Sequence, residues 1–137
     1  MPPEQLISLS KIRLENAKKL LVTSQTLIDA GDYKSSANRS YYAIFNAMRA
    51  CLALYSIDYK RHSGVISDFR LLLIKSGKLD VSLSDIITVL FEMRNQSDYN
   101  DFYVVSKVDV LTQLDNAKYF ISKVELLLNE MWETGNI

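Results

Sequence analysis

The sequence predicts an all-α protein, an antiparallel up-down bundle of four to five helices. Helix-interrupting residues are rare, because the 137-residue chain has four glycines and two prolines, and both prolines precede residue 4. Apolar residues also recur at steps of three and four along most of the chain. The hydrophobic fraction of 48% suffices for a sizeable core, so we expect a single helical domain over residues 1–137.

The first two predicted helices are separated by a glycine–aspartate pair. Apolar residues at mostly helical spacing predict a first helix from about Pro3 to Ala30. Gly31 suits its C-cap, and Asp32 suits the N-cap of a second helix over roughly residues 33–55. The apolar face of the second helix comprises Ala37, Tyr41, Ile44, Met48, Cys51, Leu52 and Tyr55.

A shorter helix and a longer one follow a polar connector. Apolar spacing predicts the third helix over residues 63–76, ending at Gly77. The fourth is predicted to begin near Ser82 or Ser84, either of which could cap it, and to continue through Arg94.

The last helix carries the longest apolar stripe. It is predicted to begin near Ser106, where Ser106 and Asp109 resemble a capping box with Asp in place of Glu, and to end at Gly135. Its stripe comprises Val108, Leu111, Leu114, Ala117, Ile121, Val124, Leu128 and Met131. The preceding run over residues 102–105 favours β-structure, but it is too short to change the helical prediction.

Composition excludes several classes of function. Sixteen basic and sixteen acidic residues balance, which argues against coating nucleic acid or a membrane through bulk charge but leaves room for a local basic site. Cys51 lies in an apolar run and is predicted to be a small buried core residue. A lone thiol and no signal-like N-terminus lead us to expect a cytoplasmic protein, and no apolar run is long enough for a membrane span. With one histidine and one cysteine, we expect no metal site and no cofactor.

Two polar clusters lie in otherwise apolar helices, where they lower stability unless they are paired. The first is Arg94-Asn95-Gln96-Ser97-Asp98-Tyr99, at the end of the fourth helix. Arg94 and Asp98 are four residues apart and share a helix face. The plain interpretation is a surface salt bridge of about 0.3–0.5 kcal/mol. Leu90, one turn earlier, instead places Arg94 near the edge of the buried stripe. Tyr99 can approach Arg94 only if the helix bends or ends near Asp98.

The second cluster, within residues 38–42, offers partners for the first. Asn38 and Tyr42 share one face of the second helix, and Arg39 lies at its edge, so any of the three could face Arg94. The plain alternative is a buried polar network that sets helix register. Tyr41 and Phe45 are predicted core residues.

His62 follows Lys60 and Arg61 in the connector before the third helix. Two interpretations remain open for this segment. It is either a solvated loop or helix start, or a small basic patch for phosphate.

Three stretches together resemble the HEPN superfamily, and more narrowly the small single-domain HEPN proteins of prokaryotes. They are residues 37–45, residues 61–66 followed by Phe69, and residues 94–99. With the flanking helices the resemblance covers about residues 15–130. It implies a helical bundle that forms a homodimer. Many HEPN proteins are metal-independent RNases, and many are toxins encoded beside a minimal nucleotidyltransferase antitoxin.

The active motif of the family is an arginine, usually followed by a polar residue, and then a histidine after four to six residues. Arg94 and Asn95 match its beginning, but Tyr99 stands at the shortest histidine spacing and no later residue is a histidine. The resemblance implies that Arg94 holds a scissile phosphate, with Asp98 and Tyr99 as the other catalytic candidates. Asp98 could act as a base only with a raised pKa. His62 could alternatively be delivered across a dimer interface.

The rival hypothesis is a non-catalytic binding module. Asn38, Arg39, Tyr42, Asn95 and His62 would then join the Arg94 cluster in a polar pocket at the dimer seam. The ligand would be a nucleotide, an RNA or a partner nucleotidyltransferase. In related toxin systems the antitoxin can adenylylate a tyrosine near the motif, which makes Tyr99 or Tyr103 a candidate modified residue. A third hypothesis is a purely structural helical dimer.

Overall fold

A computed structural model describes residues 3–58 and 61–137. Over these residues the secondary structure is helical, with no strand, which confirms the predicted all-α class. The α-helices are α1 (Glu4–Asp29), α2 (Tyr33–Ala53), α3 (His62–Phe69), α4 (Ser82–Tyr99) and α5 (Lys107–Thr134), and a π-helical turn, η1 (Arg70–Ile74), continues α3.

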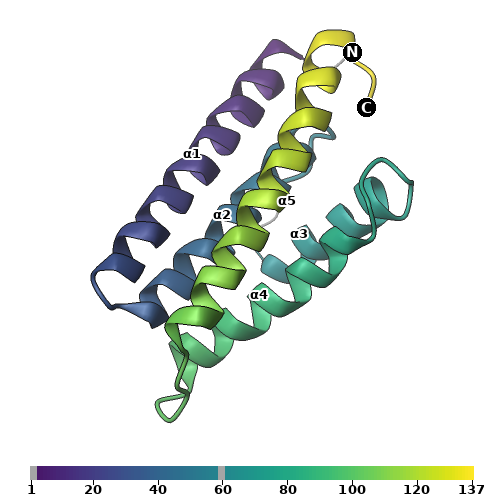
Figure 1. The fold of residues 1–137 in the computed structure, drawn as a ribbon. Coiled ribbons are helices and arrows are strands. Elements are labelled where there is room, and N and C mark those ends of the chain that lie inside the picture. The colour runs from purple at the N-terminus through teal and green to yellow at the C-terminus, as the bar shows by residue number, and fades with distance from the viewer. Residues whose placement is uncertain (1–2, 59–60) are drawn as a thin grey trace.

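The long helices form an up-down bundle. In Figure 1, α1 and α4 run toward the lower end of the view, while α2 and α5 run back toward the upper end. Helix α2 packs against α1, α3, α4 and α5. Of its 21 residues 13 are buried, against 6 of the 26 residues of α1. Because α2 is central, polar residues on it can be enclosed by side chains from several helices.

The turn between α1 and α2 confirms both predicted caps. Gly31 has φ +80°, and the N–H groups of Gly31 and Asp32 donate to the carbonyls of Ile28 and Leu27. This is the Schellman pattern that commonly ends helices at a glycine. The Asp32 carboxylate accepts a hydrogen bond from the Ser35 N–H at 3.3 Å, as an N-cap does.

The predicted cap of the last helix is also confirmed. The Ser106 hydroxyl accepts from the Asp109 N–H at 3.1 Å, and α5 ends at Gly135, which has φ +71°. The buried stripe of α5 differs from the predicted one in its first turn, where Val110 is buried and Val108 is exposed. The predicted burial of Cys51 is confirmed.

The prediction that Ser82 or Ser84 caps α4 is wrong. Helix α4 begins at Ser82 itself, whose N–H donates to the Asp80 carboxylate at 3.0 Å. The Ser84 hydroxyl instead accepts from Nε of Arg70 at 2.9 Å. Because residues 79–81 turn into the helix early, both serines lie inside α4, where a hydroxyl cannot occupy the N-cap position.

The third predicted helix is interrupted by η1. The Lys75 N–H donates to the Arg70 carbonyl at 2.8 Å, a five-residue spacing that widens the helix. None of the described helices combines the length and apolar character needed to span a bilayer.

Candidate active site

Arg94 lies at the centre of the site, on α4 and facing α2. Its side chain is 13% exposed. Nη2 donates to the Tyr42 hydroxyl at 2.9 Å, and Nη1 donates to the side-chain oxygen of Asn95 at 3.0 Å. Hydrogen bonds from a charged donor are stronger than those between neutral groups. They hold the guanidinium in one orientation at the edge of the core.

Three tyrosine rings surround the guanidinium. Its Cζ lies 5.5, 5.3 and 5.4 Å from the ring centroids of Tyr41, Tyr42 and Tyr99. A cation near the face of an aromatic ring is attracted by the electrons of that ring. The approach of Tyr99 to Arg94 requires that the helix bend or end near Asp98. Helix α4 does end there, at Tyr99.

Asp98 connects α4 to α2. Its Oδ2 lies 3.1 Å from Nε of Arg94 and accepts a hydrogen bond from the Asn38 amide at 2.9 Å. The Nε–H is not aligned for a hydrogen bond, so the contact with Asp98 is an ion pair only. Two of the three α2 candidates, Asn38 and Tyr42, therefore face the Arg94 cluster. The Asp98 carboxylate orients the Arg94 guanidinium. Because both side chains are partly buried, this ion pair is not a simple surface salt bridge.

His62 joins the same site from the first turn of α3. Its Nδ1 lies 2.9 Å from the Tyr41 hydroxyl, and its ring stacks on Phe45 with centroids 4.2 Å apart. Burial lowers the pKa of His62, and the positive charges of Arg94 and Arg49 lower it further. The imidazole is consequently neutral near pH 7.

Of the interpretations open for this segment, the helix start is confirmed, because His62 is the first residue of α3, but the His62 ring is not fully solvated. The ring is half-buried against α2, and it reaches the site within one chain, without delivery across a dimer. Of the other two residues of the expected basic patch, Arg61 is exposed at the N-cap of α3, and Lys60 lies outside the described residues.

Asp58, four residues before His62, ties the end of this connector to two helices. Its Oδ1 accepts hydrogen bonds from Nη2 of Arg49 at 2.8 Å and from Nη2 of Arg13 at 3.2 Å. Arg13 also donates from Nη1 to the Arg49 carbonyl at 3.3 Å. Sequence reasoning missed this cluster, although an arginine between two apolar residues of the first helix was an available signal.

Two other candidate residues lie outside the Arg94 cluster. Arg39 is exposed and lines a hollow of about 370 Å³ together with Lys34, Asn38 and Asp98, but no contact links its guanidinium to Arg94 within the described residues. Tyr103 is half-buried beside a separate group of buried residues that includes Val105 and Val110. Burial raises the pKa of Tyr103, and the charges of Asp109 and Glu92 raise it further.

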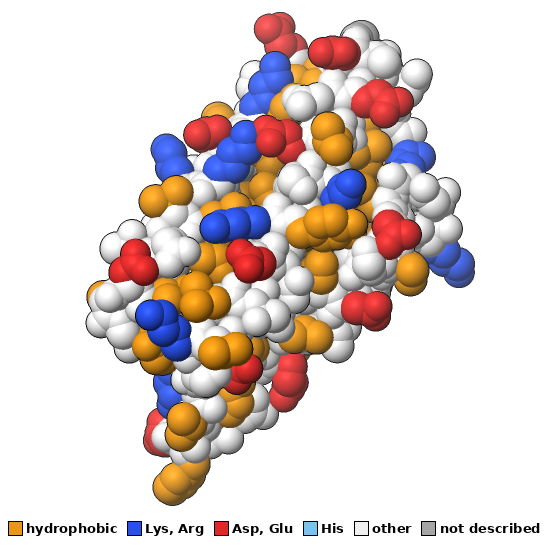
Figure 2. All heavy atoms as spheres, in the orientation of Figure 1, with side chains coloured by type: hydrophobic (Ala, Val, Ile, Leu, Met, Phe, Trp, Pro, Cys, Tyr) orange, Lys and Arg blue, Asp and Glu red, His pale blue; other side chains and the backbone are white. Residues whose placement is uncertain are grey.

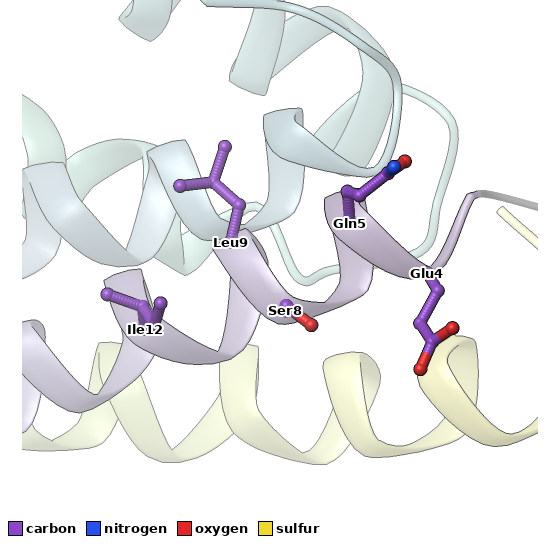
Figure 3. A pocket seen from close by; sticks show the side chains of 5 residues that line it. All are labelled: Glu4, Gln5, Ser8, Leu9 and Ile12. Atoms are coloured by element: carbon purple, nitrogen blue, oxygen red, sulfur yellow. The ribbon is translucent and has the colours of Figure 1, made fainter.

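The hollow along α1 and the distribution of surface charge add no second site to the Arg94 cluster. A hollow of about 480 Å³ runs along the first turns of α1, but its lining side chains come from one helix and do not converge, as Figure 3 shows for Glu4 and Leu9. On the face in Figure 2, basic and acidic side chains are interspersed. Over residues 3–58 and 61–137, no group of three or more His, Cys, Asp or Glu side chains could hold a metal ion.

Comparisons with known proteins agree with the helical fold, and the matched region includes His62 and Arg94. A model of the HEPN domain matches residues 10–130. A protein of Methanocaldococcus jannaschii named "Putative toxin" is 31% identical over 117 residues, covering 85% of this chain and 75% of that protein. A "UPF0332 protein" of Archaeoglobus fulgidus is 30% identical over 124 residues, covering 88% and 95%. Another of Thermotoga maritima is 27% identical over 115 residues, covering 84% and 87%.

Proposed function

This chain belongs to the HEPN-domain family, and on that premise we propose that it is the toxin-like half of a toxin–antitoxin pair and cleaves RNA at the Arg94 site without a metal. One observation carries the proposal. Tyr42, His62 and Arg94 come from three separate stretches of the sequence and meet at the junction of α2, α3 and α4. The proposal includes action in the cytoplasm as a homodimer of single-domain chains, which light scattering would test as a mass of two chains.

Arg94 supplies the phosphate contact in this proposal. A guanidinium matches the geometry of a phosphodiester and stabilises the charge that develops on its oxygens. Asp98, Tyr42 and Asn95 hold the group in place before substrate arrives. The exposed phenol of Tyr99, beside Arg94, donates a hydrogen bond to the same phosphate.

His62 replaces the missing motif histidine as the general base. In the tautomer that carries its proton on Nδ1, His62 donates to the Tyr41 hydroxyl, and the lone pair of Nε2 can then act as the base. Nε2 takes the proton of the ribose 2′-OH, the 2′-oxygen attacks phosphorus, and the 5′-oxygen leaves with a proton from solvent. The products are a 2′,3′-cyclic phosphate and a 5′-hydroxyl. The lowered pKa of His62 keeps the base form available at neutral pH.

The test is cleavage of an unstructured, end-labelled RNA in the presence of EDTA. We expect wild-type protein to cleave, and we expect Arg94→Ala and His62→Ala each to lower the rate by about 10²-fold or more. Lys19→Ala removes an exposed cation of α1 and serves as the charge-matched control with an unchanged rate. An inactive wild type, or an Arg94→Ala variant that cleaves as fast as wild type, would contradict the proposal.

A second candidate is a non-catalytic module whose tyrosine is modified. The observation that favours it is Tyr99, which occupies the histidine position of the motif and is 74% exposed. Its phenol oxygen would attack the α-phosphorus of ATP bound to a nucleotidyltransferase partner, with pyrophosphate leaving.

Co-expression with a nucleotidyltransferase encoded beside the gene tests this candidate by intact mass. We expect the addition of one AMP to be lost in Tyr99→Phe and retained in Tyr103→Phe, because Tyr103 is half-buried. An unmodified protein, or retention in Tyr99→Phe, rules this candidate out.

A further inference from the structure

A groove leads away from His62 between α3, η1 and α4. Its volume is about 640 Å³, within the usual range for small-molecule sites. His62 lines one end, so the groove adjoins the proposed general base directly. None of the roles described above for Arg94, Asp98 or Tyr42 uses this space.

Apolar side chains form much of the groove. Ile66 and Ile87 are buried, and the half-buried ring of Phe91 lies beside them. The Phe91 ring also contacts Tyr41 edge to face, with centroids 5.8 Å apart. Tyr41 in turn contacts both His62 and Arg94. The groove and the Arg94 site are therefore joined by one continuous set of rings.

Hydrogen-bonding groups lie along the same groove. Arg70 is fixed by bonds from Nε to the Ser84 hydroxyl at 2.9 Å and from Nη2 to the Thr88 hydroxyl at 2.7 Å. No hydrogen bond from its Nη1 is found within the described residues, which leaves that donor for a ligand. The π-helical turn begins at Arg70, and such turns are frequent at functional sites.

The charges of the groove point to an uncharged ring as its occupant. Arg70 and Glu92 are its two charged lining residues, and their charges cancel. Arg94 also has an acidic neighbour, Asp98, so the phosphate is assigned to Arg94 by the proposed function and not by the charge of the groove. A flat heterocycle instead gains from aromatic and apolar walls together with donors and acceptors at its edge. Arg70 and Glu92 supply one of each.

We propose that this groove binds the nucleobase next to the phosphate held by Arg94. The inference rests on the proposed RNA site, and it names the part of the substrate that lies beyond His62. The RNA backbone crosses Arg94, and the adjoining base enters between α3 and α4 beside Phe91. Contacts from Arg70 and Glu92 then give the protein a preference among bases.

The direct experiment uses ¹⁵N-labelled protein titrated with the four ribonucleosides and with their 5′-monophosphates. We expect nucleosides to shift amide resonances of residues that line the groove, with one base preferred. Ser67→Trp places a large ring in the groove from an exposed position on α3 and should weaken nucleoside binding at least tenfold. Ser122→Trp, at an exposed position on α5, is the matched control and should bind like wild type.

The outcomes separate this inference from the proposed function. If nucleosides leave the groove resonances unchanged and RNA cleavage still requires Arg94, the assignment of the groove is wrong and the proposed function stands. Nucleoside binding in the groove together with Arg94-independent RNA cleavage overturns the proposed function alone. A change in molecular mass by light scattering in Ser67→Trp, without loss of nucleoside binding, assigns the groove to a second copy of the chain and also overturns the inference.

Discussion

Arg94 shows how a polar side chain is accommodated next to an apolar core. Burial of an unpaired guanidinium would cost several kcal/mol. Asp98 supplies the opposite charge, and Tyr42 and Asn95 supply acceptors. The sequence indicated the pairing with Asp98, because the two residues are four apart on a helix. The hydrogen bond with Tyr42 spans 52 residues of the chain and depends on how α2 and α4 pack.

His62 gives a residue-scale prediction, because it is the only histidine of the chain. The pKa of His62 is lower in the folded protein than in the unfolded chain, where it is about 6.5. As the pH falls below about 6.5, the unfolded chain therefore binds more protons than the folded protein does. Stability from this residue is therefore present above that pH and lost as pH falls. Urea unfolding at pH 7.5 and pH 5.5 should show a larger loss for wild type than for His62→Asn. Equal losses would show that His62 is not shielded from protonation.

At the scale of elements, local signals located most helix ends. Gly31, Asp32, Ser106 and Gly135 act at or beside the caps where they were expected, because capping depends on residues within one turn. Helix α4 begins at Ser82, as expected, but neither candidate serine caps it, and the π-helical turn was not predicted. The Ser84 hydroxyl bonds instead to Arg70, the first residue of that turn, 14 positions away.

The turn between α1 and α2 provides the element-scale prediction. Gly31 has φ +80°, a conformation that strains any residue with a Cβ, and nothing lies within 4 Å of the position a Cβ would take. Gly31→Ala should therefore destabilise the protein by about 1–2 kcal/mol through backbone strain alone. Gly31→Asn should cost less, since asparagine tolerates this conformation better. Chemical unfolding of the two variants checks the order, and an alanine variant as stable as wild type would contradict it.

Across the whole molecule, the cluster of Asp58, Arg13 and Arg49 joins α1, α2 and the segment that leads to His62. Arg13 is only 7% exposed, and burial is the main cause of its lowered pKa. Asp58 is its charge partner, and the carboxylate itself remains largely in solvent. The cluster thus ties Asp58 to both α1 and α2.

Removal of the Asp58 charge should therefore weaken the whole bundle. We expect Asp58→Asn to lower the free energy of unfolding by about 1 kcal/mol, because the buried charge of Arg13 loses its opposite charge while the amide oxygen can still accept its hydrogen bond. The same change made in an Arg13→Met background should cost much less, which a double-mutant cycle of urea unfolding would measure. An equal cost in both backgrounds would mean that Asp58 acts independently of Arg13.

The link between α4 and α5 exposes a large apolar side chain. Phe102 is 95% exposed in the link between α4 and α5, close in sequence to Tyr99. Figure 2 shows hydrophobic side chains gathered at the end of the molecule that this link forms. The exposed Phe102 ring adds to the apolar surface at this end of the molecule.

The helical class, most helix ends and the polar cluster that contains Arg94 could be predicted from the amino-acid sequence, because periodicity and capping act over short distances. The absence of the motif histidine is also visible there. The position of His62, beside Tyr41 and Phe45 of the same chain, could not be predicted without the folded structure. That outcome depends on packing between α2 and α3, which brings Tyr41 and His62, 21 residues apart in the chain, within hydrogen-bond distance. Contacts across such separations depend on the folded arrangement of several helices, which no local sequence pattern specifies.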